Sequence, residues 1–101
     1  MLLATASFRI APGKNGPALE YLHKVVKHIK SVTGTDYRVL SRLVGPAGHV
    51  VLSAEHKDAK EWDASRAKIS ADKAWQKMVT DAGTAGLFIP GSVETALWET
   101  L

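Results

Sequence analysis

The amino-acid sequence predicts an α+β fold in which helices cover one face of a four-stranded antiparallel sheet. Hydrophobic periodicity changes along the chain between the two-residue repeat of strands and the repeat of about 3.6 residues of helices, in the order strand, helix, strand, strand, helix, strand. The eight glycines and four prolines gather in short clusters between these segments, where turns and helix caps are expected. A chain of 101 residues can bury one core and not two, so we expect a single domain spanning residues 1–101.

The first half of the chain contains a strand, a long helix and a second strand. Residues 2–11 alternate between small or apolar side chains and polar ones, which is typical of a strand with one buried face. Residues 17–33 place apolar side chains three and four positions apart, as an amphipathic helix does. Pro17 suits the first helical turn, and Gly34 suits the position that ends the helix. Residues 37–44 are rich in β-branched and apolar side chains and predict the second strand.

The second half begins with the strand formed by residues 49–56, which a Gly-Pro-Ala-Gly turn joins to the preceding strand as a hairpin. Residues 58–82 have a helical composition, and their first residues have the spacing of a capping box. Asp72 is a second capping residue inside this stretch, so we expect a break near residues 70–72. Gly83 is expected to end the helix, and residues 92–99 form the last strand.

The two halves of the chain, residues 1–45 and 48–101, therefore each contain a strand, a helix and a strand. This is the split βαβ arrangement of a ferredoxin-like sandwich. The predicted fold class is α+β with the order βαββαβ, two helices on one face of the sheet, and the first and third strands in its middle.

The two faces of the predicted sheet differ in character. The side that we assign to the helices is uniformly small or apolar, and comprises Ala4, Ala6, Phe8, Ile10, Val39, Leu43, Val50, Leu52 and Ala54. The opposite side mixes charged and apolar groups, and exposing it would invite association. We therefore expect a homodimer that packs two such faces together, through a set that comprises Arg9, Arg38, Leu40, Arg42, Glu55, Glu94 and Trp98. The alternative is an ordinary antiparallel sheet with one face in water.

Six short segments, spread over nearly the whole chain, carry a family resemblance: residues 9–14, 19–22, 37–40, 55–62, 71–76 and 91–99. They resemble the dimeric α+β barrel superfamily, and most of all its NIPSNAP-like and antibiotic-biosynthesis-monooxygenase-like members. The resemblance implies a homodimer whose two sheets form a barrel, with a pocket in each subunit between sheet and helices. The shared motifs are architectural, so they are informative about the fold and say little about activity.

The resemblance implies a small protein that binds, oxidises or isomerises an apolar molecule, aromatic or polyketide-like, without a cofactor. The candidates for lining its pocket are Phe8, Leu22, Trp62 and Trp75, although tryptophan serves ordinary packing equally well. Some relatives carry a histidine on the second helix or, where they degrade haem, an asparagine on the first strand. This chain has neither, which argues against haem degradation. The alternative function is a non-catalytic dimerisation or stress-associated module with a solidly packed core.

No two of the four histidines have the spacing of metal ligands. His23 and His28 are five positions apart on a helix, and His49 and His56 fall on opposite faces of a strand, so we expect no metal site. His56 shares its face with the apolar strand residues, at the end of the sheet where the second helix begins. An imidazole at a pocket mouth there is a candidate general base. The alternative is a structural histidine that is hydrogen-bonded to loop backbone.

The net charge of +3 lies on one stretch, residues 14–30, which holds four lysines and a single glutamate. No arginine-rich run or aromatic platform accompanies these lysines, so we interpret them as a solvated helix face and expect no nucleic-acid partner. The absence of cysteine excludes disulfides and thiolate chemistry. Residues 1–7 are apolar but short and without basic residues, so we expect no signal peptide, no membrane association and a cytoplasmic location.

Overall fold

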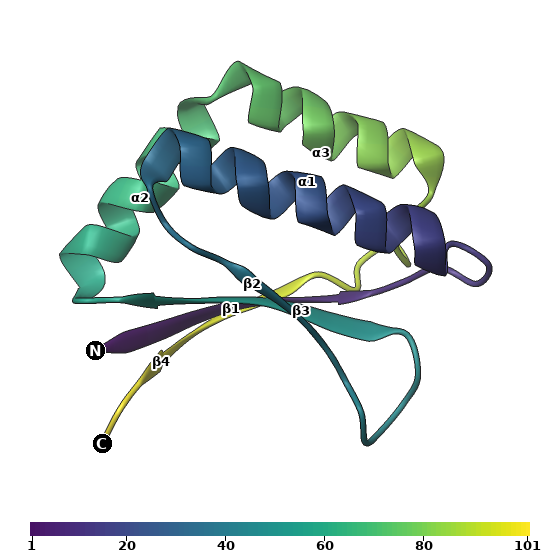
Figure 1. Ribbon diagram of the computed structural model, residues 1–101, viewed down its shortest axis with the longest axis horizontal. Coiled ribbons are helices and arrows are strands. Elements are labelled where there is room, and N and C mark those ends of the chain that lie inside the picture. The colour runs from purple at the N-terminus through teal and green to yellow at the C-terminus, as the bar shows by residue number, and fades with distance from the viewer.

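A computed structural model describes residues 1–101 and contains four strands and three helices. In chain order they are β1 (Leu2–Arg9), α1 (Asn15–Thr33), β2 (Arg38–Ser41), β3 (His49–His56), α2 (Ala59–Ala71), α3 (Lys73–Ala85) and β4 (Glu94–Glu99). The three helices lie on one side of the sheet, and the connection between β2 and β3 extends away from them (Figure 1). The predicted α+β class is confirmed. No helix combines the length and the apolar character that a membrane span needs.

The sheet is antiparallel, with the strand order β2-β3-β1-β4, so β1 and β3 occupy its middle as predicted. In the register, Ala4 lies opposite Ala54 and Phe8 lies opposite Val50. Val39 lies opposite Leu52, which places β2 in phase with the two central strands. Because side chains alternate between faces, this register brings the small and apolar set to the helix-covered side.

Helix α1 lies over the centre of the sheet and buries one stripe of side chains. Ala18, Leu22, Val25 and Ile29 are buried along it, three and four positions apart. The neighbouring Leu19 and Val26 lie on the flank of this stripe and pack against the core cluster. At the C-terminus Gly34 has a φ of 77°, and its N–H donates to the carbonyl of Lys30. A left-handed residue of this kind is the usual end of a helix, as the sequence indicated.

The predicted break in the second helical stretch separates α2 from α3. Asp58 begins α2, and its carboxylate accepts from the N–H of Glu61 at 2.9 Å. Asp72 then ends α2 and begins α3, where its carboxylate accepts from the N–H of Trp75 at 2.8 Å. Each carboxylate satisfies a backbone donor that has no partner within its helix. The two helices can therefore follow different directions over the sheet, as Figure 1 shows.

Helix α3 continues past Gly83, where the sequence predicted its end, and stops at Ala85. The left-handed conformation falls on Gly86 instead, with a φ of 64° and an N–H directed at the carbonyls of Ala82 and Gly83. The additional turn brings Leu87 into the core, where it is buried. Burial of that side chain accounts for the longer helix.

Strand β2 is shorter than the predicted range of 37–44. The last pairing beyond it is the N–H of Arg42, which donates to the carbonyl of His49 at 3.2 Å. The assignment of Leu43 to the helix-covered face is wrong, because pairing stops before this residue and its side chain is 94% exposed. Gly45 and Gly48, both with positive φ, shape the loop that follows. The last strand likewise begins at Glu94 and not at residue 92.

Candidate ligand-binding site

An apolar cavity of about 480 Å³ lies between the sheet and helices α1 and α3. Thirteen of the 17 residues that line it are hydrophobic. The helices cover this edge of the sheet incompletely: Leu97 on the helix-facing side of β4 is 39% exposed, and Val93, just before the strand, is 56% exposed. A space of this size and character is typical of small-molecule sites.

A second cavity of about 490 Å³ adjoins the first toward α2. The two share four lining residues, Ala6, Tyr37, Trp75 and Thr95, so we treat them as one cleft. Trp62 of α2 and Trp75 of α3 both line the second cavity, together with Ile69 and Leu97. The cleft therefore contains two indole rings beside a row of small and aliphatic side chains.

The structure distributes the predicted lining residues over this cleft. Phe8, Leu22 and Trp75 line the first cavity, whereas Trp62 lines only the second. At the end of the first cavity the ring of Phe88 lies 5.1 Å from that of Phe8 and 5.9 Å from that of Tyr21. These centroid distances are those of favourable aromatic pairs. Burial, and secondarily the negative charge of Asp81, raise the pKa of Tyr21.

Tyr37 and Arg66 are the notable polar residues of the cleft. Tyr37 lines both cavities, and burial raises the pKa of its phenol, so the hydroxyl remains protonated at neutral pH. The guanidinium of Arg66 lies 5.1 Å from the ring of Trp62, within the range of a cation–π contact. Both residues also line a small space of about 40 Å³ behind Trp62.

His56 lies outside the lining of both cavities. Its side chain is fully buried at the end of β3, and neither ring nitrogen has a hydrogen-bond partner. The nearest carboxylate is that of Glu61, whose Oε1 is 3.9 Å from Nδ1. The residue thus lies beneath the start of α2, whereas the sequence placed it at a pocket mouth. Its role as a general base stays a prediction.

A polar hollow of about 500 Å³ lies beside His56, where α1 ends and α2 begins. Eight of its nine lining residues are polar, charged or glycine. Its acidic residues include Asp36, which pairs with Lys30 at 2.9 Å, and Glu61, whose carboxylate accepts from the N–H of Lys57 at 3.4 Å. No three histidine, aspartate or glutamate side chains anywhere in the structure are grouped closely enough to hold a metal ion.

The face of the sheet opposite the helices carries the residues predicted to form a dimer interface. Trp98 is 59% exposed there and Leu40 is 45% exposed. The indole N–H of Trp98 donates to the hydroxyl of Thr5 at 3.2 Å, which ties the ring to the neighbouring strand β1. Arg9 and Arg42 gather at one end of this face beside His49. Desolvation and, secondarily, the charges of Arg42 and Arg9 lower the pKa of that imidazole.

The fold and the cleft together define an α+β sandwich with an apolar ligand-sized space between its sheet and helices. Neither a family model nor a curated protein matches the sequence. Solved structures do match the fold. A NIPSNAP domain protein from Burkholderia xenovorans is 20% identical, with a TM-score of 0.81 over 100% of this chain and 95% of that one. A NIPSNAP family protein from Agrobacterium tumefaciens is 18% identical, with a TM-score of 0.79 over 99% and 92%.

An antibiotic biosynthesis monooxygenase is also similar, at 18% identity and a TM-score of 0.71 over 100% of this chain and 99% of that one. The resemblance that the sequence segments carried is thereby confirmed for the fold. At these identities the likeness concerns the backbone arrangement, and the chemistry has to be argued from the site itself.

Two residues of the cleft were not singled out as site residues from the sequence. Tyr37 directly precedes β2 and has the parity of the half-buried Val39, which was a sufficient signal for its direction. Arg66 is four positions after Trp62 on α2, a spacing that brings two side chains together on a helix. Because Trp62 was a predicted lining residue, this spacing was the signal that could have found Arg66.

Proposed function

We propose that this protein binds a small apolar molecule, aromatic or polyketide-like, in the cleft between its sheet and helices. The observation that carries the proposal is the cleft itself: two adjoining cavities of about 480 and 490 Å³ between the sheet and the helices. A solidly packed core, which a purely structural module would have, leaves no such space. Apolar walls favour an apolar ligand because its transfer from water removes apolar surface on both sides.

The indole rings of Trp62 and Trp75 favour an aromatic ligand over an aliphatic one. Both line the second cavity, and both are half-buried, so each presents part of a ring surface to the cleft. Aromatic pairs gain attraction beyond the area that they bury. Conversion of the bound molecule by cofactor-free oxidation or by isomerisation is the catalytic form of this proposal. The similarity of the fold to a protein described as an antibiotic biosynthesis monooxygenase supports this catalytic form.

We further propose that the functional unit is a homodimer in which the uncovered faces of two sheets pack together. The exposed Trp98 and Leu40 on that face would be buried between the copies. Arg9, Arg38 and Arg42 lie on the same face as Glu55 and Glu94, so a two-fold arrangement can set opposite charges against each other. This assembly leaves the cleft, on the other side of the sheet, open.

Binding is tested with naphthalene methanol, a neutral aromatic probe, by titration against tryptophan fluorescence and by calorimetry. The variant Thr95→Phe places a ring on the exposed edge strand inside both cavities without disturbing a buried residue. The matched control Thr84→Phe adds the same ring to α3 at an exposed position outside the cleft. We expect saturable binding that falls by about tenfold or more in Thr95→Phe alone, since the added ring occupies the ligand's volume. Equal affinity in both variants, or no saturable binding to the wild type, would contradict the proposal.

A further inference from the structure

Arg66 is an exposed residue of α2 that lines the cleft, and its positive charge has no acidic partner in the protein. The ion pairs of the molecule all lie elsewhere, on Lys24, His28, Lys30, His56 and Lys77. No aspartate or glutamate lines either cavity of the cleft. The guanidinium is instead held against the ring of Trp62, at 5.1 Å from its centroid. This contact places the guanidinium beside a ring of the cleft while leaving its hydrogen-bond donors free of protein partners.

Tyr37 adds a second free donor beside this charge. Its hydroxyl makes no hydrogen bond within the protein, in contrast to that of Thr5, which donates to the carbonyl of Ala96. Tyr37 is half-buried and lines the same two spaces as Arg66, the second cavity and the small space of about 40 Å³. Because burial raises the pKa of the phenol, the hydroxyl remains a donor at neutral pH and above.

The two spaces differ in volume, so each suits a different part of a ligand. The second cavity, at about 490 Å³, has room for fused aromatic rings beside the two indoles. The small space, at about 40 Å³, has room for one polar group of the size of a water molecule or a little larger. An oxyanion in or near that space would receive the Tyr37 hydroxyl and the Arg66 guanidinium, and charge-assisted bonds of this kind are the strong ones.

We propose that the ligand of this cleft is an aromatic carboxylate, with its rings beside Trp62 and Trp75 and its carboxylate between Tyr37 and Arg66. The proposal rests on the binding function proposed above and narrows its ligand class. A neutral aromatic molecule would offer no negative charge to Arg66. An aromatic amine would place its positive charge against that of Arg66.

The experiment compares naphthoate with naphthalene methanol, two probes that share the rings and differ in the carboxylate. We expect the wild type to bind naphthoate about tenfold more tightly or better, as hydrogen bonds to a charged group allow. The variant Arg66→Met keeps much of the stem that packs on Trp62 and removes the charge, so the ratio of its affinities for naphthoate and for the alcohol should fall toward one. Arg66→Lys should keep part of the preference, and Tyr37→Phe should lower naphthoate affinity by about threefold to tenfold.

The matched control is Lys68→Met, which removes a positive charge from the same helix at an exposed position outside the cleft. It should leave the affinity for both probes unchanged. Equal binding of naphthoate and alcohol to the wild type, or equal effects of Arg66→Met and Lys68→Met, would overturn the inference and leave the apolar binding function standing. Failure of both probes to bind the wild type would overturn the binding function as well.

Discussion

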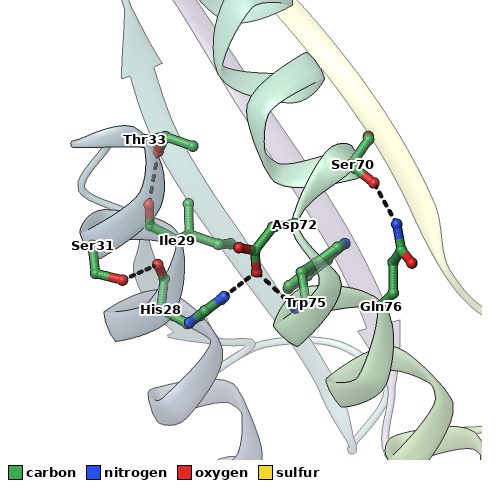
Figure 2. A network of polar contacts seen from close by, with 8 residues as sticks. All are labelled: His28, Ile29, Ser31, Thr33, Ser70, Asp72, Trp75 and Gln76. Carbon is green, nitrogen blue, oxygen red and sulfur yellow. Dashed lines mark hydrogen bonds and ion pairs between the residues drawn. The ribbon is translucent and has the colours of Figure 1, made fainter.

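The Nε2 atom of His28, near the middle of α1, lies 2.5 Å from the Oδ2 atom of Asp72, the residue at which α2 gives way to α3. Figure 2 shows that the same carboxylate accepts from the backbone N–H of Trp75, at 2.8 Å. The side-chain amide of Gln76 donates across the junction to the carbonyl of Ser70, at 3.0 Å. One carboxylate therefore caps α3 and ties the helix break to α1, which sets the position of Trp75 over the cleft.

The first prediction concerns this carboxylate. The variant Asp72→Ala removes both the cap of α3 and the partner of His28, so its melting temperature should fall by several degrees. Asp72→Asn should lower it less, because asparagine is also a good capping residue. Asp81→Asn, which removes the exposed pair with Lys77, is the control and should have little effect. Differential scanning calorimetry of the four proteins measures these differences.

The stability contributed by Asp72 should depend on pH with a definite sign. The hydrogen bond from His28, and then that from the Trp75 N–H, lower the pKa of Asp72 from its ordinary value of 3.8. A carboxyl whose pKa is lower in the folded state stabilises the fold above the unfolded-state pKa, and loses this effect as the pH falls through the folded-state pKa. The difference between wild type and Asp72→Ala should thus be full near neutral pH and shrink in acid. A difference that grows on acidification would contradict this assignment.

The second prediction compares Gly83 of α3 with Gly86, the residue that follows the helix, because the two differ in backbone conformation. Gly83 is helical, and a Cβ built on it meets no atom within 4 Å. Gly83→Ala should therefore stabilise the protein by about 0.5–1 kcal/mol, the difference in helix propensity between the two residues. Gly86, with a φ of 64°, should respond in the opposite sense, since alanine there is strained by about 1–2 kcal/mol. Urea unfolding measures the stability of both variants. A loss of stability in Gly83→Ala would show that a methyl group at this position meets other atoms.

The third prediction concerns the buried imidazole of His56. Both of its nitrogens lack a partner, and a buried polar group in that state costs about 1–3 kcal/mol. His56→Leu should accordingly be as stable as the wild type or more stable, with the cavity and strain terms of an imperfect fit offsetting part of the gain. Urea unfolding measures the effect. A large destabilisation would show that the imidazole has a partner in solution, and an unchanged affinity for naphthalene methanol is expected in either case because His56 lies outside the cleft.

The fold could be predicted from the sequence where the local hydrophobic pattern agreed with the need to bury one face of the sheet. The alternation in β1 and β3 set the two faces, and the register Ala4 to Ala54 and Phe8 to Val50 agrees with it. Asp72 signalled the helix break because a capping residue acts on its own next turn. Leu43 was assigned to the wrong place because the length of a strand depends on its pairing partner. The end of α3 was predicted at Gly83, because the sequence does not show which glycine will adopt a positive φ.

The cleft was harder to predict from the sequence than the fold. Phe8, Leu22 and Trp75 could be assigned to its walls from face and parity alone. The volume of the cleft could not be predicted, because it depends on how α2 and α3 pack over the sheet, which is a property of the tertiary structure. The position of His56 was also only partly predictable. The sequence indicated the face of the sheet on which His56 lies, but not that α2 covers its side chain and separates it from the cleft.

The fourth prediction concerns the uncovered face of the sheet. If two copies pack through it, the protein should sediment at micromolar concentration with twice the mass of one chain. Trp98→Glu and Leu40→Glu each place a carboxylate where an exposed apolar group would be buried between copies, and an unpaired charge at such a site is strongly unfavourable. Each variant should sediment as a monomer and remain folded, since neither side chain belongs to the core cluster. Lys60→Glu, on the surface of α2, makes a comparable change away from this face and should stay dimeric. A wild type that sediments as a single chain would end the dimer proposal, and the cleft, which lies on the opposite side of the sheet, would be unaffected.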